Sequence, residues 1–125
     1  MPSTILIVDD SRTVRTMVRQ ALEADHHQVI EATDGVAALA ALDMGPADLV
    51  ITDVNMPEMD GLKLVRALRD RPDYRFIPIL VLTTESGDEI KQRGRDAGAT
   101  GCLVKPFNPD HLRKTVEHVS RRRQP

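Results

Sequence analysis

The chain has 125 residues, with 17 Lys and Arg against 19 Asp and Glu and a formal net charge of −2. Its 41% hydrophobic and 29% charged residues are typical of a soluble globular protein, and we expect one domain over residues 1–125 with no output domain. A nucleic-acid-binding domain normally carries a basic excess, so we expect no nucleic-acid partner. The single cysteine excludes an internal disulfide and indicates a reducing compartment. No apolar run approaches the ~18 residues of a membrane helix, so we expect a cytoplasmic protein without membrane insertion.

Five short runs rich in β-branched and aliphatic residues predict strands. They are Thr4–Val8, Gln28–Ala32, Asp48–Thr52, Pro78–Leu82 and Cys102–Val104. Four of them are almost continuously apolar, which is typical of strands buried on both faces of a parallel sheet. The run Gln28–Ala32 is half polar and suits an edge strand.

Helical periodicity fills the stretches between and after these runs. The apolar stripes are Val14, Met17, Val18, Ala21 and Leu22; Val36, Leu39 and Ala40; Gly61, Leu64, Val65 and Leu68; and Leu112, Val116 and Val119. Asn108 followed by Pro109 suits the start of the last helix. Strands and helices therefore alternate strictly, which predicts an α/β fold with a parallel sheet, right-handed crossovers and helices on both faces.

A weaker helix is expected before the last strand. Ser86 and Glu89 resemble a capping box that would open this helix, which we expect to end near Ala97. Its apolar face is little more than Ile90 and Ala97, and Gly94 in its interior costs roughly 1 kcal/mol relative to Ala. We therefore expect it to be the least firmly packed helix.

Polar side chains follow four of the predicted strands. Asp9 and Asp10 follow the first, Asp53 the third, Thr83 the fourth and Lys105 the fifth. The carboxyl ends of parallel strands meet at one edge of the sheet, where open α/β folds bind ligands. One such Asp is usually only a helix N-cap, but the whole set predicts a site.

Three crowded carboxylates repel each other unless a cation intervenes, and oxygen ligands favour Mg²⁺. Such a site suits phosphoryl transfer, in which a carboxylate can be the nucleophile, and Asp53 on the central strand is the best placed.

These residues belong to motifs that resemble the receiver domain of two-component response regulators, most closely the single-domain chemotaxis regulators of the CheY type. The motifs are Val8-Asp9-Asp10-Ser11, Asp53-Val54-Asn55-Met56-Pro57 with Asp60-Gly61, Thr83-Thr84-Glu85 and Val104-Lys105-Pro106-Phe107. The resemblance covers essentially the whole chain. It implies a flavodoxin-like (βα)5 fold, doubly wound, with a five-stranded parallel sheet in the order 2-1-3-4-5.

The resemblance also implies the role of each site residue. Asp53 would accept the phosphoryl group, and Mg²⁺ (or Mn²⁺) would be bound by Asp9, Asp10, Asp53 and the backbone carbonyl of Asn55. Lys105 would bond a phosphoryl oxygen through its ammonium group, and the Lys105–Pro106 peptide is cis in the family.

Three further positions concern the switch and the lifetime of the phosphate. Thr83 would reach the phosphoryl group only after transfer, and Asn55 and Glu85 would tune phosphate loss, although Glu85 can equally be an exposed loop acid. Cys102 stands where the family usually has a switch aromatic; it is either a small core residue or a redox-sensitive thiol. Without that aromatic, the switch runs through the Thr83 loop and the weak helix, or output takes another route.

The function implied is that of a phosphoacceptor signalling protein rather than an enzyme, although it supports its own phosphorylation and autodephosphorylation. A sensor histidine kinase of the CheA type would be the phosphodonor. A flagellar motor switch protein and a phosphatase would be further partners. We expect the protein itself to be a monomer. Phosphorylation would change the surface of the last two helices and the strand between them, in chemotaxis and flagellar rotation. The alternative is a phosphate sink or relay intermediate without motor binding.

Other readings fit the residues less well. A flavodoxin-like electron carrier would need a hydroxyl-rich phosphate loop where Asp9 and Asp10 stand. A phosphatase of the haloacid dehalogenase type would need an acid where Asn55 stands. The histidine pairs His26–His27 and His111 with His118 lack a third ligand for a metal site. The run Arg121–Arg123 is more typical of a helix C-terminus than of a nucleic-acid patch.

Overall fold

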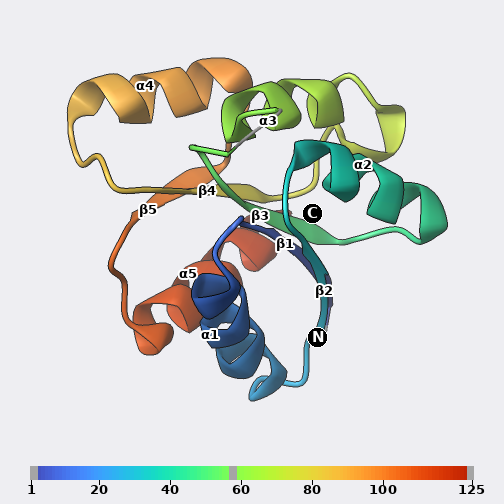
Figure 1. Ribbon diagram of the computed structural model, residues 1–125, viewed down its shortest axis with the longest axis vertical. Coiled ribbons are helices and arrows are strands. Elements are labelled where there is room, and N and C mark those ends of the chain that lie inside the picture. The colour runs from blue at the N-terminus through green and yellow to red at the C-terminus, as the bar shows by residue number, and fades with distance from the viewer. Residues whose placement is uncertain (1–2, 57–58, 124–125) are drawn as a thin grey trace.

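The computed structural model describes residues 3–56 and 59–123, and the side chains of these residues up to 121. Strands and helices alternate along the chain (Figure 1). The elements are β1 Thr4–Val8, α1 Arg12–Glu23, β2 Gln28–Ala32, α2 Gly35–Met44, β3 Leu49–Asp53, α3 Gly61–Arg69, a short 3-10 turn η1 Pro72–Tyr74, β4 Ile79–Thr83, α4 Asp88–Ala97, β5 Gly101–Val104 and α5 Pro109–Arg123.

The five strands form one parallel sheet in the order β2-β1-β3-β4-β5. This confirms the predicted flavodoxin-like fold. Strands β3 and β4 are buried along their whole length, as their apolar sequences predict. Each begins and ends one residue later than expected, so Asp53 and Thr83 are the last residues of their strands.

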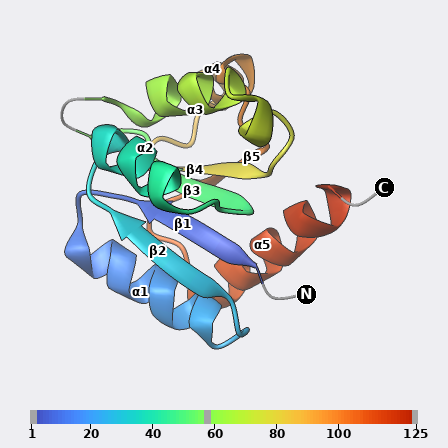
Figure 2. The same cartoon turned by 90° about the vertical axis from the view of Figure 1, so that its right-hand side faces the viewer.

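Helices cover both faces of the sheet (Figures 1 and 2). Helices α1 and α5 pack on one face around Leu22 and Leu112, and helices α2, α3 and α4 pack on the other around Leu42 and Leu68. The two cores hold the strands between them and bring the carboxyl ends of β1, β3, β4 and β5 to one edge.

Short polar side chains begin most of the helices. The backbone N–H groups of Val14, Ala37, Lys63 and His111 donate to the side chains of Ser11, Asp34, Asp60 and Asn108, respectively. Helix α4 differs, because Gly87 precedes it and no side chain caps it. The predicted capping box of Ser86 and Glu89 is therefore wrong, and α4 begins after Gly87 and ends at Ala97, as expected for its end.

The buried face of α2 differs from the expected one at Val36 and Ala40, whereas Leu39 packs against the core as expected. The helix buries Gly35, Ala38 and Leu42, whereas Val36 is 55% exposed and Ala40 also lies on the solvent side. Nine of its ten residues are uncharged, so its sequence has almost no polar face from which the orientation can be inferred.

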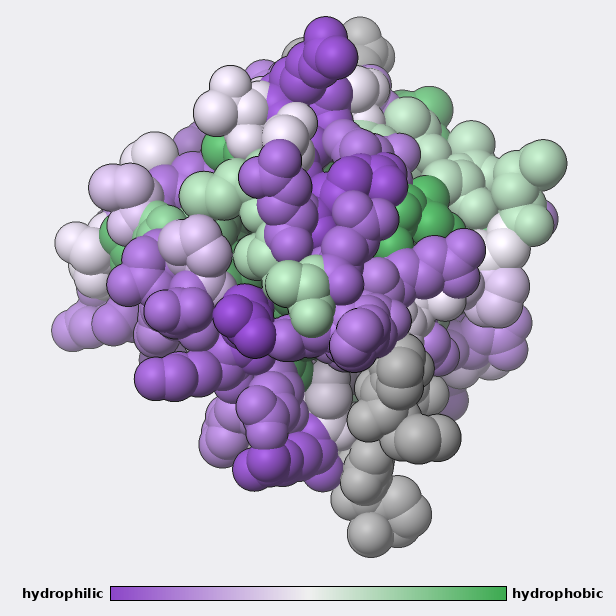
Figure 3. Space-filling view, turned by 90° about the horizontal axis from the view of Figure 1, so that it is seen from below, coloured by the Kyte–Doolittle hydropathy of each residue, from purple (hydrophilic) through white to green (hydrophobic). Residues whose placement is uncertain are grey.

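The surface seen from the side of α1 and α5 is mostly hydrophilic (Figure 3), as expected for amphipathic helices that turn their charged faces outward. Among the helices in the described part of the chain, none combines the length and the apolar character needed to cross a membrane.

Candidate functional site

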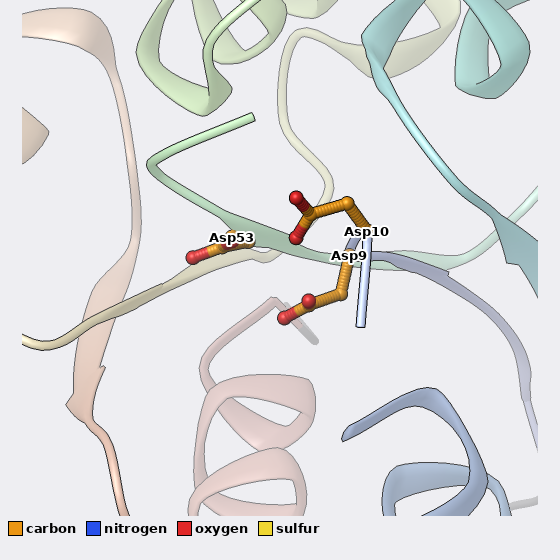
Figure 4. A group of neighbouring side chains, drawn as sticks. All are labelled: Asp9, Asp10 and Asp53. Atoms are coloured by element: carbon orange, nitrogen blue, oxygen red, sulfur yellow. The ribbon is translucent and has the colours of Figure 1, made fainter. Parts of the chain in front are cut away.

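Three carboxylates meet at the carboxyl edge of the sheet. Asp9 and Asp10 lie in the loop between β1 and α1, and Asp53 ends β3 (Figure 4). One carboxylate oxygen of each lies within 4.8 Å of the others. Asp9 and Asp53 are buried, whereas Asp10 is exposed, so the cluster is accessible to solvent on the side of Asp10.

Lys105, from the loop after β5, places a cation beside these carboxylates. Its ammonium Nζ lies 2.8 Å from Asp9 Oδ2 and 3.2 Å from Asp53 Oδ1. The Lys105–Pro106 peptide is cis, as the resemblance implied. The ammonium group thus joins two carboxylates from neighbouring strands.

The charges of the cluster change the pKa values of its members. Burial raises the pKa of Asp53 above its ordinary value, the charges of Asp9 and Asp10 raise it further, and Lys105 only partly offsets the increase. For Lys105, burial lowers the pKa, but the hydrogen bond and charge of Asp9 and the charge of Asp53 outweigh burial and raise it. The ammonium group is therefore held charged, while the acids carry repulsion that one cation does not relieve.

This donor set fits a hard divalent cation. Three carboxylate oxygens from separate segments lie close enough to share one ion, and oxygen ligands are those that Mg²⁺ and Mn²⁺ prefer. The raised pKa of Asp53, caused first by burial and then by the charges of Asp9 and Asp10, agrees with a site that favours an added positive charge. The cluster is thus a group that could hold a metal ion.

A glycine of α3 packs directly against the end of β3. The N–H of Gly61 donates to the carbonyl of Val54 at 2.8 Å. A Cβ atom at Gly61 would lie only 2.0 Å from the carbonyl oxygen of Asp53. Only glycine permits this approach of α3 to the strand end. The sequence pattern placed Gly61 on a helix stripe and in a motif, but it did not reveal why the position requires glycine.

Thr83 lies buried at the end of β4. Its hydroxyl oxygen accepts a hydrogen bond from the N–H of Glu85 at 3.0 Å, and Glu85 itself is exposed. The start of the β4–α4 segment is therefore held by the side chain that the resemblance assigns to the switch.

The other predicted site residues occupy different surroundings. Asn55 is exposed at the start of the β3–α3 loop. Pro57 of the same motif lies outside the described residues. Cys102 is partly exposed and packs against the core on the side of the sheet that carries α4, and burial raises the pKa of its thiol, which disfavours the thiolate.

Comparison with known proteins places this fold and site in one family. The model of the response regulator receiver domain matches residues 5–117. The chain belongs to this family. Receiver domains are phosphoacceptor signalling modules, generally not enzymes, and they interact with sensor histidine kinases.

Individual relatives are similar along the whole domain. The chemotaxis response regulator CheY4 of Vibrio cholerae has a structure with a TM-score of 0.91 and 47% identity, covering 95% of this chain and 99% of that one. The chemotaxis protein CheY1 of Helicobacter pylori is 39% identical over 117 residues, 92% of this chain and 94% of CheY1.

Longer proteins match as well. The response regulator MprA of a Mycobacterium species (strain KMS) is 41% identical over the full 125 residues, which make up 54% of MprA. The first curated relatives are longer than this chain, which spans between 32% and 54% of their length. Receiver domains of this kind therefore serve in proteins with different roles.

Proposed function

We propose that this protein accepts a phosphoryl group on Asp53 from the phosphohistidine of a sensor histidine kinase of the CheA type. The observation that carries the proposal is the convergence of Asp9, Asp10 and Asp53 within 4.8 Å of one another, with the ammonium group of Lys105 bridging two of them. A carboxylate oxygen of Asp53 forms a bond to phosphorus while the bond between phosphorus and the donor nitrogen breaks. The imidazole leaves with the electron pair of that bond.

The chain's own residues prepare this step. Asp9 and Lys105 are held together by a hydrogen bond of 2.8 Å, which keeps the ammonium group beside Asp53, where the charge of the incoming phosphoryl oxygens would be offset. A Mg²⁺ or Mn²⁺ ion bound by Asp9, Asp10, Asp53 and the backbone carbonyl of Asn55 would supply the remaining positive charge. Asn55 and Glu85, which are both exposed, would set how fast water removes the phosphate.

Phosphorylation then acts on the segment after β4. The hydroxyl of Thr83 would donate to a phosphoryl oxygen, and the movement would disturb its hydrogen bond with the N–H of Glu85. Helix α4 buries only Ile90, Gly94 and Ala97 and has no side-chain cap, so it resists such a bias weakly. Cys102 cannot act as a switch aromatic, which leaves the Thr83 loop and α4 to change the α4-β5-α5 surface.

The surface change would control chemotaxis through a flagellar motor switch protein, with a phosphatase ending the signal, in the cytoplasm. Support for chemotaxis comes from the similarity to CheY1 and CheY4, which extends over nearly their full length. The alternative, a phosphate sink or relay intermediate, follows from the same site without a motor partner. Its support is that matched proteins such as MprA carry the domain in other roles.

The first experiment is labelling by acetyl phosphate with and without Mg²⁺, in the parent protein and in Asp53→Asn. We expect Mg²⁺-dependent labelling of the parent and none of the variant. Equal labelling of both proteins would show that Asp53 is not the acceptor.

The switch is tested by hydrogen exchange with and without beryllofluoride and Mg²⁺. We expect changed protection across residues 85–97, and unchanged protection there would exclude α4 as the responding element. Capture of a motor switch component by the phosphorylated protein favours the chemotaxis role, whereas capture of the histidine kinase alone favours the phosphate sink.

A further inference from the structure

The guanidinium group of Arg15 connects helix α1 to the loop that carries two of the site acids. One terminal nitrogen donates to the backbone carbonyl of Asp9 at 2.7 Å, and Nε pairs with Glu31 Oε1 on β2 at 3.0 Å. The side chain is only 13% exposed. Its guanidinium group is therefore held by two contacts, and Arg15 is not one of the site residues that the motifs identify.

The backbone that Arg15 holds is that of Asp9 and Asp10. The N–H of Asp9 donates to the carbonyl of Ala32 on β2 at 3.1 Å, so the peptide before Asp9 is bonded to β2 and the peptide after it is bonded to Arg15 of α1. Asp10 is exposed. The position of its carboxylate in the cluster therefore depends on the conformation of its backbone. Arg15 therefore contacts the carbonyl group that begins the Asp9–Asp10 peptide.

The charge of Arg15 is balanced by its neighbours. Glu31 also pairs with Arg19 at 2.7 Å, and Arg19 lies 3.4 Å from Glu23. Two cations and two anions thus form one chain along α1 and β2. Because Glu31 and Glu23 balance the two arginine charges, the contact that sets Arg15 apart is its hydrogen bond to the Asp9 carbonyl.

We propose that Arg15 is a positioning residue of the acidic site, which fixes the Asp9–Asp10 peptide so that Asp10 presents its carboxylate to the ion shared with Asp9 and Asp53. This inference rests on the proposed function, in which the cluster binds a divalent cation. Residues that orient metal ligands without touching the metal typically change metal affinity 10–100-fold when they are lost.

Arg19 offers a matched control for Arg15. It lies one turn further along α1 and shares the partner Glu31, but it makes its contacts to Glu31 and Glu23 and not to Asp9. Arg15→Ala and Arg19→Ala remove the same charge from the same helix and leave Glu31 with one partner. Only the first removes the hydrogen bond to the Asp9 carbonyl.

The experiment measures Mg²⁺ binding by calorimetry in the parent protein, Arg15→Ala, Arg15→Lys, Arg19→Ala and Arg19→Lys. We expect the Kd for Mg²⁺ to rise about tenfold in Arg15→Ala and to stay within about twofold in Arg19→Ala. Arg15→Lys should recover part of the affinity, because an ammonium group can still donate to the carbonyl. In the metal-free protein, the amides of residues 10 and 11 should exchange faster in Arg15→Ala than in Arg19→Ala.

Each other result has a definite meaning. Unchanged affinity in Arg15→Ala, or equal losses in the two alanine variants, would overturn the positioning role in favour of no effect or of a charge effect. If Arg15→Ala does not fold, the comparison of Arg15→Lys with Arg19→Lys decides in the same way, with a weaker loss expected only at position 15. Mg²⁺ binding by the parent protein is measured before that of any variant. Its absence in the parent would instead refute the proposed function.

Discussion

Replacement of Gly61 by alanine should damage the site without touching any of its charged groups. The added Cβ would lie 2.0 Å from the carbonyl oxygen of Asp53, 2.9 Å from its carbonyl carbon and 3.0 Å from the Cα of Val54. All three atoms belong to the backbone, so rotation of a side chain cannot relieve these contacts. Helix α3 and the end of β3 must separate instead.

The size of the effect follows from that separation. Ordinary contacts of a Cβ begin at about 3.4 Å, so the 2.0 Å approach must open by about 1.4 Å. Overpacking of this kind costs about 1–3 kcal/mol of stability. The same movement strains the hydrogen bond from the Thr52 hydroxyl to the Asp53 carbonyl, now 3.0 Å long, and shifts the Asp53 carboxylate. A misplacement of about 1 Å at a reacting group can cost 100-fold in rate.

The assay combines urea unfolding with labelling by acetyl phosphate in Mg²⁺. We expect Gly61→Ala to lose about 1–3 kcal/mol in free energy of unfolding and about 100-fold in labelling rate of the folded protein. Gly45→Ala is the control, since a Cβ there meets nothing within 4 Å and the backbone is extended. A Gly61→Ala protein as stable and as rapidly labelled as the parent would refute the reasoning.

Three other substitutions test the packing of the fold. Gly94→Ala should raise the free energy of unfolding by about 1 kcal/mol, measured in urea, because a Cβ there would lie 3.7 Å from Val81 Cγ2 in ordinary contact and the helix gains alanine's propensity. In the folded protein, burial lowers the pKa of His27, whose Nδ1 accepts a hydrogen bond from the N–H of Ser3 at 3.0 Å. In the unfolded chain the pKa of this histidine is about 6.5, so below that pH the unfolded chain binds more protons than the folded protein does. Stability should therefore fall as the pH drops below about 6.5, and His27→Gln should flatten that part of the unfolding profile. Arg69→Ala should cost about 2–3 kcal/mol in urea unfolding, because its guanidinium donates to several backbone carbonyls that would lose their partner.

Controls for these three variants come from neighbouring exposed positions. Gly87→Ala adds a Cβ where nothing lies within 4 Å and outside the interior of α4. His118→Gln removes an exposed histidine of α5, and Arg66→Ala removes an exposed arginine of α3. A rise in stability for Gly87→Ala as large as that for Gly94→Ala, a flattened pH profile in His118→Gln, or an equal loss in Arg66→Ala would contradict the respective explanation.

Most of the fold could be predicted from the sequence, because its determinants are local. Continuous apolar runs such as Thr4–Val8 show which strands are buried on both faces, and alternation with amphipathic helices permits only parallel pairing with crossovers. The meeting of Asp9, Asp10 and Asp53 follows from this topology, because parallel strands end at a common edge.

The remaining features depend on contacts between segments far apart in the chain, which periodicity cannot show. The orientation of α2 was mistaken because a helix that is apolar on every side has no preferred phase in its sequence, and only its neighbours select the face with Ala38. The approach of Gly61 to Asp53 and the hold of Arg15 on the Asp9 carbonyl arise only when α3 and α1 dock on the sheet. Local patterns thus specify which elements form and where the acids gather, whereas docking specifies the backbone contacts that orient those acids.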